Sequence, residues 1–240
     1  MLSNSSILKR GLTDEEWLDQ SYNTSKSINS KRLAATIINY FNKFNLAKYP
    51  GVSNETIVEE LKKDHEGLYT YLNDFVQYIS QQVTPSSTSV YYAYFKSYLR
   101  SKGVRISNED AKGIVKIPKV VEQERFPLTA NLINIILFYS NAEHKAIYLF
   151  MASSGCRIRE TIQIKKSDII ILDNTVAVNL RGETTKTKKP RQVFMSTEAW
   201  SAIKPIYDSK DADDYIFINE YHEKSAVQNH ELYFKDVRRR

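Results

Sequence analysis

The sequence is short of cysteine, glycine and histidine, and each shortage excludes a class of protein. It contains one cysteine, seven glycines and four histidines in 240 residues. A single cysteine, Cys156, cannot form an intramolecular disulfide or a cysteine-rich zinc site. The histidines are scattered, with no H-E-x-x-H or similar ligand pair. No G-x-G-x-x-G or G-x-x-x-x-G-K-[S/T] string is present, so nucleotide-dependent chemistry is disfavoured. We therefore expect neither a metal nor a cofactor.

Long apolar runs are also absent. The longest uncharged stretch, residues 126–142, contains a proline and several polar residues. It is shorter than the roughly 20 apolar residues of a membrane helix. The N-terminus lacks the apolar core of a signal peptide and soon becomes acidic. We expect an intracellular protein, cytoplasmic or nucleoid-associated, that makes no membrane contact.

The charge balance permits a polyanionic partner. Lysine and arginine total 34 against 28 aspartate and glutamate, which gives a formal net charge of +6. Many basic proteins bind no nucleic acid, so this excess allows DNA or RNA as a partner without identifying it. With 42% hydrophobic residues, the chain can bury real cores, and its length suits one large domain or two ordinary ones.

The first half of the sequence is typical of a helical domain. Residues 1–26 are rich in serine, asparagine and threonine without sustained periodicity, and are interpreted as a flexible extension. Helical spacing of apolar residues begins at Ser27. The pattern predicts helices from Ser27 to the break at Tyr49, and over residues 55–63, 66–82 and 86–102. A helical domain is therefore predicted over residues 27–115.

The helix predicted at residues 86–102 carries two stripes. The stripe assigned to the core contains Tyr91, Tyr94, Phe95, Tyr98 and Leu99. The second stripe contains Tyr92, Lys96 and Arg100 at i, i+4 and i+8. A solvated face is the default for such a stripe, and a phosphate-contacting face is the alternative.

A change of pattern marks a second domain. Helical periodicity is lost from Gly103, and prolines bracket a linker at residues 116–127. Thr129 can cap a following helix, and Gly155 closes the next one. Strands are predicted at residues 169–172, 175–180, 192–195 and 215–218, with helices at 197–207 and from 226 onward. The fold class is therefore mainly α, then α+β with a small antiparallel sheet.

Two clusters of positive charge lie in this second domain. The turn at Gly155 delivers Arg157 to the start of a helix, where a guanidinium could hold a phosphate. Arginines at helix starts are common, so this signal alone is weak. The second cluster lies on a basic, flexible hairpin loop and contains Lys186, Lys188, Lys189 and Arg191. Such loops are usually just solvated.

The spacing of these clusters resembles a known family. The string S-G-C-R-I-R-E-T-I-Q-I-K-K-S-D-I resembles T-G-x-R-x-x-E-x-x-x-L-x-x-x-D-I, the signature of tyrosine recombinases or phage-integrase-like proteins. Arg157, Glu160, Ile164 and Asp168 fall on its positions. The string K-T-K-K-P-R-Q-V-F-M resembles the K-G-x-K-x-R-x-V-P-L hairpin of that family, with Lys186 on the position of the catalytic lysine.

The resemblance implies a fold and a chemistry. Residues 27–115 would form a helical, SAM-like core-binding domain, and residues 128–240 part of a catalytic domain. Such enzymes cut DNA without a metal, by attack of a tyrosine on a backbone phosphate. Arg157 would then stabilise charge on the nonbridging oxygens, and Lys186 would protonate the leaving 5′ oxygen. Glu160 is predicted to orient Arg157, and Asp168 to be structural.

The sequence departs from this family in its last part. The family's H-x-x-R motif, followed by the tyrosine nucleophile, is absent, because neither His222 nor His230 has an arginine three positions on. The chain is therefore expected to be a catalytically incomplete recombinase. Tyr233 is assigned to packing rather than to a substitute nucleophile. Cys156 is assigned to the buried interior.

Double-stranded DNA is the partner that the resemblance implies. The cations predicted to contact it are Lys31, Arg32, Lys96, Arg100, Arg159, Lys188, Lys189 and Arg191. Assembly of the complete protein as a homo-tetramer on DNA is left open. Two alternatives remain: a naturally truncated relative or regulator that binds DNA without cutting it, and a helical protein-interaction module. Salt dependence separates the last from the others, since phosphate binding weakens steeply as salt rises.

Overall fold

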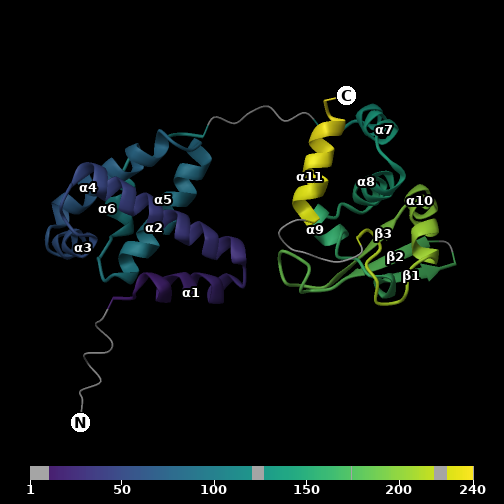
Figure 1. Ribbon diagram of the computed structural model, residues 1–240, viewed down its shortest axis with the longest axis horizontal. Helices are drawn as coiled ribbons and strands as arrows, with labels where there is room; N and C mark the ends of the chain where they lie inside the picture. Colours follow the sequence, from purple (N-terminus) through teal and green to yellow (C-terminus); the bar gives the residue numbers. More distant parts are fainter. Residues whose placement is uncertain (1–10, 121–126, 174, 219–225, 240) are drawn as a thin grey trace, which may run out of the picture. The chain divides into compact units, whose positions relative to one another are not determined.

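The computed structural model describes residues 11–120, 127–173, 175–218 and 226–239, and the chain divides into two compact units (Figure 1). The first unit, residues 1–124, is helical in its described part. The second, residues 125–240, combines helices with an antiparallel sheet. The predicted class, mainly α and then α+β, is confirmed.

The first unit packs its helices around an aromatic core. The helices are α1 (Asp14–Ser25), α2 (Ile28–Lys48), α3 (Asn54–Lys63), α4 (His65–Ser80), α5 (Pro85–Ser101) and α6 (Asn108–Ile114). Phe75 of α4 and Phe95 of α5 stack with ring centroids 3.7 Å apart, and Phe41 of α2 lies 5.8 Å from Phe95. Aromatic pairs of this kind add stability beyond the area that they bury. The four helices predicted from periodicity are present.

The prediction that residues 1–26 form a flexible extension is wrong where the structure describes them. Residues 1–10 lie outside the described part. Thr13 and Glu16 form a capping box that starts α1, with each side chain accepting the other residue's backbone N–H. Trp17 is buried and lies edge-on to Tyr98 at 5.0 Å. A single buried tryptophan anchors α1, which explains why no apolar periodicity marked it.

The segment after Gly103 lacks helical periodicity in the sequence, yet it contains a helix and core residues. The α6 helix lies in this segment, and Val104, Ala111 and Val115 are all buried in the core of the first unit. Seven helical residues are too few to show a clear helical period. The core thus ends at Val115. Residues 121–126 of the predicted linker lie outside the described part.

One stripe on α5 was assigned to the wrong face. Tyr92, predicted beside Lys96 and Arg100, is buried, whereas Tyr91 and Tyr94 are only partly buried. Phe95, Tyr98 and Leu99 are in the core as predicted. The side chains of Lys96 and Arg100 therefore lie at the edge of a buried surface.

The second unit places its helices against a three-stranded sheet. Its elements are α7 (Ala130–Phe138), α8 (Ala142–Ser154), α9 (Ile158–Thr161), the 3-10 helix η2 (Lys166–Asp168), β1 (Ile169–Leu172), β2 (Thr175–Leu180), β3 (Arg191–Met195), α10 (Thr197–Asp208) and α11 (Ala226–Val237). The strand order is β1-β2-β3, antiparallel throughout. Figure 1 shows α8 and α10 beside the sheet, where Phe150, Ile203 and Val178 share one core.

The last part of the second unit differs from one prediction and agrees with another. Residues 215–218 were predicted as a strand, but they contribute only an isolated bridge between Tyr215 and Lys165. Ile216 and Phe217 are nevertheless buried. The apolar run therefore reflects packing in the core rather than pairing with another strand. On α11, Tyr233 stacks on His144 at 3.6 Å, and its hydroxyl accepts the backbone N–H of Asn141. These contacts are those of a packing residue.

The burial of Trp17 predicts that α1 is part of the folded first unit. We expect Trp17→Ala to lower the free energy of unfolding by about 3–5 kcal/mol, because a large aromatic side chain leaves a cavity. Chemical denaturation followed by circular dichroism measures this loss. The matched control is Tyr22→Ala, an exposed aromatic on the same helix, which should change stability little. Equal stability of the two variants would mean that α1 does not pack on the core.

Candidate functional site

The turn after α8 presents Arg157 at the surface. Gly155 ends α8 with a φ of 68°, a left-handed conformation that glycine adopts without strain. Two residues later, Arg157 is the N-cap of the short helix α9. Its side chain is 61% exposed. The local sequence therefore holds the backbone of Arg157 in a fixed turn while its guanidinium remains open to a ligand.

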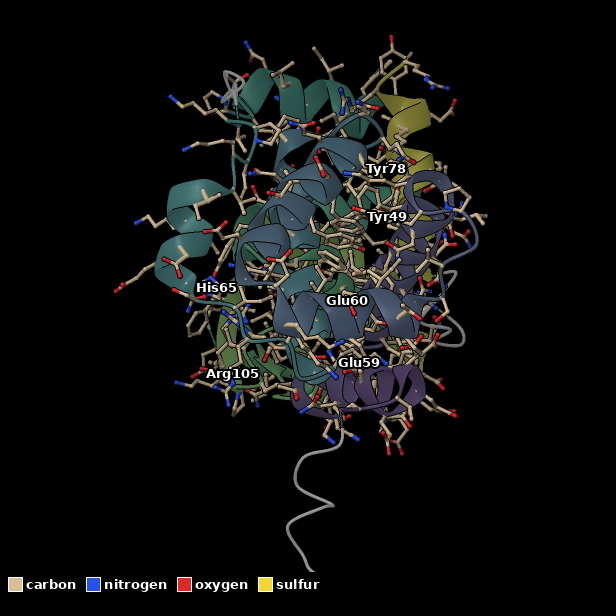
Figure 2. The ribbon with its side chains drawn as sticks, turned by 90° about the vertical axis from the view of Figure 1, so that its left-hand side faces the viewer. Tyr49, Glu59, Glu60, His65, Tyr78 and Arg105 are labelled. Atoms are coloured by element: carbon tan, nitrogen blue, oxygen red, sulfur yellow. The ribbon has the colours of Figure 1, made fainter. Side chains whose placement is uncertain are left out.

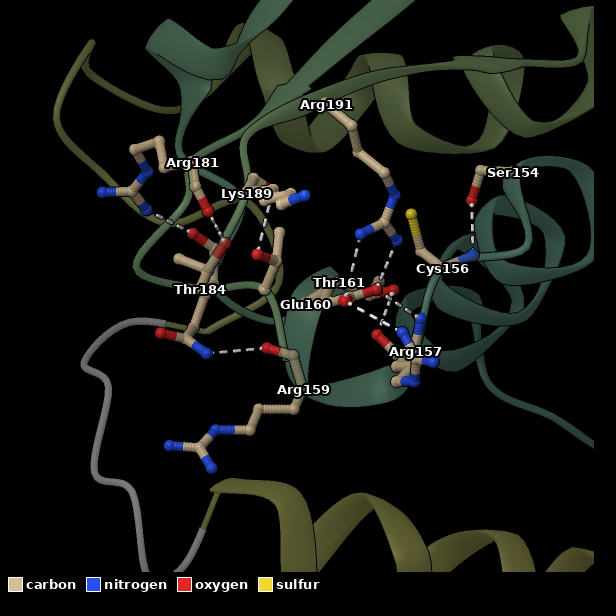
Figure 3. A network of polar contacts seen from close by, with 12 residues as sticks. Ser154, Cys156, Arg157, Arg159, Glu160, Thr161, Arg181, Thr184, Lys189 and Arg191 are labelled. Carbon is tan, nitrogen blue, oxygen red and sulfur yellow. Dashed lines mark hydrogen bonds and ion pairs between the residues drawn. The ribbon is translucent and has the colours of Figure 1, made fainter. Parts of the chain in front are cut away.

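A buried carboxylate lies directly behind this arginine (Figure 3). The side chain of Glu160 is only 2% exposed. Its Oε2 accepts the backbone N–H of Arg157 at 3.0 Å, and its Oε1 lies 3.3 Å from Nη1 of the same residue. From β3, Arg191 donates Nη2 to Oε2 at 2.8 Å and Nη1 to Oε1 at 3.3 Å. Glu160 thus holds two arginines from different elements.

These contacts keep Glu160 ionised. Burial by itself raises the pKa of this carboxyl, because a low-dielectric setting disfavours charge. The hydrogen bonds and positive charges of Arg191 and Arg157 outweigh burial, so the pKa of Glu160 lies below its usual value. The prediction that Glu160 orients Arg157 rests on these two contacts with it.

The hairpin loop between β2 and β3 is tied to the same frame at both ends. Leu180 and Arg191 are paired across its base. At one end, Nη2 of Arg181 donates to the carbonyl of Gln163, just after α9, at 2.7 Å. Arg181 also forms an ion pair with Asp168 at 3.3 Å. At the other end, Arg191 binds Glu160. Arginines therefore connect both ends of the loop to the segment that carries Arg157.

The loop itself is more ordered than its composition indicated. Thr184 and Thr185 are buried, and the hydroxyl of Thr185 lies 3.1 Å from the carbonyl of Gly182 and 3.0 Å from that of Lys189. Lys186, by contrast, is exposed at the loop's turn. The prediction of a flexible hairpin missed these hydrogen bonds at the base of the loop. Lys186 follows the buried Thr185 directly.

The contacts of Asp168 are those of a structural residue. Its Oδ2 accepts the backbone N–H of Lys165 at 2.9 Å, and its side chain pairs with Arg181. Both contacts close the turn that leads into β1. Asp168 therefore fixes where the sheet begins relative to α9.

Arg191, which was predicted to contact DNA, makes its contacts within the protein in this structure. Its guanidinium is bound to Glu160 by two hydrogen bonds. Sequence reasoning could not find this pairing, because it depends on which strand end lies beside α9. Of the other predicted cations in this unit, Lys188, Lys189 and Arg159 are exposed. Lys188 donates to the carbonyl of Glu183 at 3.2 Å.

The predicted cations of the first unit all have neighbours within that unit. Lys31 pairs with Asp19 at 2.6 Å. Arg32 is exposed and donates to Asn29 at 3.3 Å. Nζ of Lys96 lies 4.8 Å from the ring centre of Tyr92, and burial lowers the pKa of Lys96. Arg100 donates to Asn108 at 2.7 Å and to the carbonyl of Ile106 at 2.9 Å.

A basic hollow beside Arg100 was missed in the sequence. It is lined by His65, Arg100 and residues 103–107, and Figure 2 shows His65 and Arg105 on the same side of this unit. Arg105 is exposed. The available signal was the arginine and lysines of the segment after α5, which carry no helical periodicity.

A cysteine and a metal cluster are two further features that could add chemistry at such sites. Cys156 is buried, and burial raises the pKa of its thiol, so it remains uncharged. Among the described residues, no group of three or more acidic, histidine or cysteine side chains could hold a metal ion. Within the same residues, no helix has the length and apolar character needed to span a bilayer.

The buried carboxylate predicts a specific pH dependence of stability. Glu160→Gln should lower the free energy of unfolding by roughly 1–3 kcal/mol, because Arg191 and Arg157 lose their anionic partner. The pKa of Glu160 is lower in the folded state, so its contribution is complete above the unfolded value of about 4.3 and is lost as the pH falls further. The difference from the wild type should therefore shrink below about pH 4.

Urea denaturation between about pH 7 and pH 3 measures this dependence. Glu183→Gln is the matched control, since that carboxylate also pairs with an arginine but is largely exposed. It should cost little at any pH. An equal loss in both variants, or one that does not change with pH, would contradict the assigned role of Glu160.

Comparison with known proteins agrees with the resemblance seen in the sequence. Residues 128–240 match the model of the phage integrase family. No curated protein matches the chain. A crystal structure of XerA recombinase is 20% identical, with a TM-score of 0.40, over 94% of this chain and 76% of that one.

A second solved structure shows the shared fold. It is XerH site-specific recombinase bound to a palindromic difH substrate, in a post-cleavage complex. The identity is 16% and the TM-score 0.50, over 92% of this chain and 67% of that one. Residues 128–240 are therefore similar to the phage integrase family, and the fold of the chain is similar to that of a site-specific recombinase.

Proposed function

We propose that this chain binds double-stranded DNA and that Arg157 and Lys186 act on a backbone phosphate in site-specific recombination or integration. One observation carries the proposal: the exposed guanidinium of Arg157 is braced from behind by the buried carboxylate of Glu160. A fixed, outward-facing guanidinium suits a phosphate, because it can donate two parallel hydrogen bonds. The family match over residues 128–240 supports the same chemistry.

The proposed roles follow from the charge that develops in phosphoryl transfer. Attack on a phosphodiester builds negative charge on the nonbridging oxygens, and a preorganised cation stabilises it without a metal. Arg157 supplies that cation. The departing 5′ oxygen needs a proton, which Lys186 donates as general acid from its exposed place on the loop.

We further propose that the two units have different roles. Residues 27–115 act as a core-binding domain on DNA, with residues 116–127 as the linker and residues 128–240 as part of the catalytic domain. The DNA in the XerH complex supports a DNA partner for this chain too. Such a protein acts inside the cell beside the nucleoid, and the complete enzyme assembles on DNA as a homo-tetramer.

The proposed reaction also needs a second arginine and a nucleophile, which the family supplies from a later motif. Its 240 residues contain no H-x-x-R motif, and none of its tyrosines is assigned as the nucleophile. The alternative proposal is a relative or regulator that binds DNA without cutting it, with Arg157 and Lys186 as phosphate contacts. The reading frame beyond the codon for Arg240 separates the two. A continuation through H-x-x-R to a tyrosine supports the recombinase, and an immediate stop codon supports the non-cleaving relative.

Salt dependence tests the DNA proposal. We expect the affinity for a mixed-sequence duplex to fall steeply between about 50 and 200 mM salt, as counterions released on binding are recaptured. Arg157→Ala and Lys186→Ala should each weaken binding and each reduce the slope of log K against log salt by about one. Fluorescence anisotropy of a labelled duplex gives both quantities.

The control for this experiment is an exposed cation outside the proposed site. Lys204 on α10 pairs with Asp208 in the exposed last turns of that helix, so Lys204→Ala should leave both affinity and slope near the wild-type values. Binding that does not respond to salt would overturn the DNA proposal in favour of a protein-interaction module. A loss for Lys204→Ala equal to that for Arg157→Ala would show only a general effect of charge.

A further inference from the structure

We infer that Arg191 is a positioning residue: it neutralises Glu160 so that Arg157 presents net positive charge to DNA, and it touches no DNA itself. This inference rests on the proposed function. It replaces the direct contact that the loop's composition suggested, and it adds a residue to the proposed phosphate site.

The first argument is geometric. Glu160 is buried, and both of its oxygens accept from Arg191, at 2.8 and 3.3 Å. The two parallel bonds use the guanidinium fork in the orientation that fits a carboxylate best. Nη1 and Nη2 of Arg191 are thus engaged by the carboxylate, although its side chain is 38% exposed. Arg157, bonded to the same carboxylate through Nη1 alone, keeps its side chain mostly exposed.

The second argument concerns charge. Arg157, Glu160 and Arg191 carry +1, −1 and +1, so the group keeps one net positive charge. Without Arg191 the sum would be zero, and the carboxylate would oppose any phosphate that approaches Arg157. Because Glu160 is buried, water screens its charge less than it would screen the charge of an exposed carboxylate. Arg191 therefore determines whether Arg157 can attract an anion.

The third argument concerns the loop. Arg191 is the first residue of β3 and pairs with Leu180 across the base of the loop that carries Lys186. Its bond to Glu160 links that base to the turn that holds Arg157. One residue thus sets both the charge behind Arg157 and the attachment of the loop.

A charge-rescue experiment on the whole chain tests this inference. Arg191→Met should weaken duplex binding about tenfold at low salt, as expected when one effective phosphate contact is lost. The double variant Arg191→Met with Glu160→Gln restores one net positive charge. It should recover binding to within a few fold of the wild type. Direct contact between Arg191 and a phosphate predicts instead that removing Glu160 gives no recovery.

A pH profile provides a second readout that a merely structural role would not produce. In Arg191→Met, Glu160 loses its strongest partner and its pKa rises, since burial then dominates. Lowering the pH should protonate Glu160 and restore part of the lost affinity. Duplex binding by the double variant should show no such recovery, because the glutamine that replaces Glu160 does not titrate. A parallel response of both variants to pH would overturn the inference.

Folding controls keep the outcomes distinct. Arg191→Met leaves a buried carboxylate with fewer partners, so circular dichroism checks that each variant is folded. If Arg191→Met is unfolded, Arg191→Lys is used in its place. Because lysine keeps the positive charge, the duplex affinity of this variant should stay within a few fold of the wild type. A tenfold loss in Arg191→Lys would overturn the inference. Salt-independent binding by the wild type would instead refute the proposed DNA function, whatever Arg191 does.

Discussion

The site depends on one buried carboxylate. A charge as inaccessible as that of Glu160 is stable only when partners satisfy it, and here they are two arginines and a backbone N–H. The arrangement places α9 and β3 at a fixed separation. It also holds Arg157 at the surface, where the positive charge of Arg191 offsets the negative charge of Glu160. The same interaction thus specifies local structure and local electrostatics.

The rest of the second unit supports this interaction. Gly155 ends α8 so that the chain turns into α9, Asp168 and Arg181 fix the start of the sheet, and buried threonines shape the loop beneath Lys186. Each of these contacts is modest by itself, since partly exposed ion pairs contribute little to stability. Together they connect the turn that carries Arg157 to the base of the loop that carries Lys186, as the proposed catalysis by preorganised charge would require.

Much of the fold and part of the candidate site could be predicted from the sequence, and the predictions that failed did so for physical reasons. The long helices and the hairpin follow from apolar period and turn residues, and Arg157, Glu160 and Lys186 follow from motif spacing. The helix α1 could not be predicted, because Trp17 is its one fully buried residue, and one residue gives no apolar period. Tyr92 was placed on the wrong face because aromatic residues surround α5 on more than one side. The partner of Arg191 depends on tertiary contact between a strand end and a distant turn, which no local pattern encodes.

The most direct test of this account is a nitrogen NMR spectrum of the arginine side chains in the whole chain, recorded with and without duplex DNA. We predict that the guanidinium signals of Arg157 shift as DNA binds, while those of Arg191 keep the position and slow exchange of a group bonded to Glu160. Assignment uses Arg157→Lys and Arg191→Lys. Signals of Arg191 that shift while those of Arg157 stay unchanged would contradict the account.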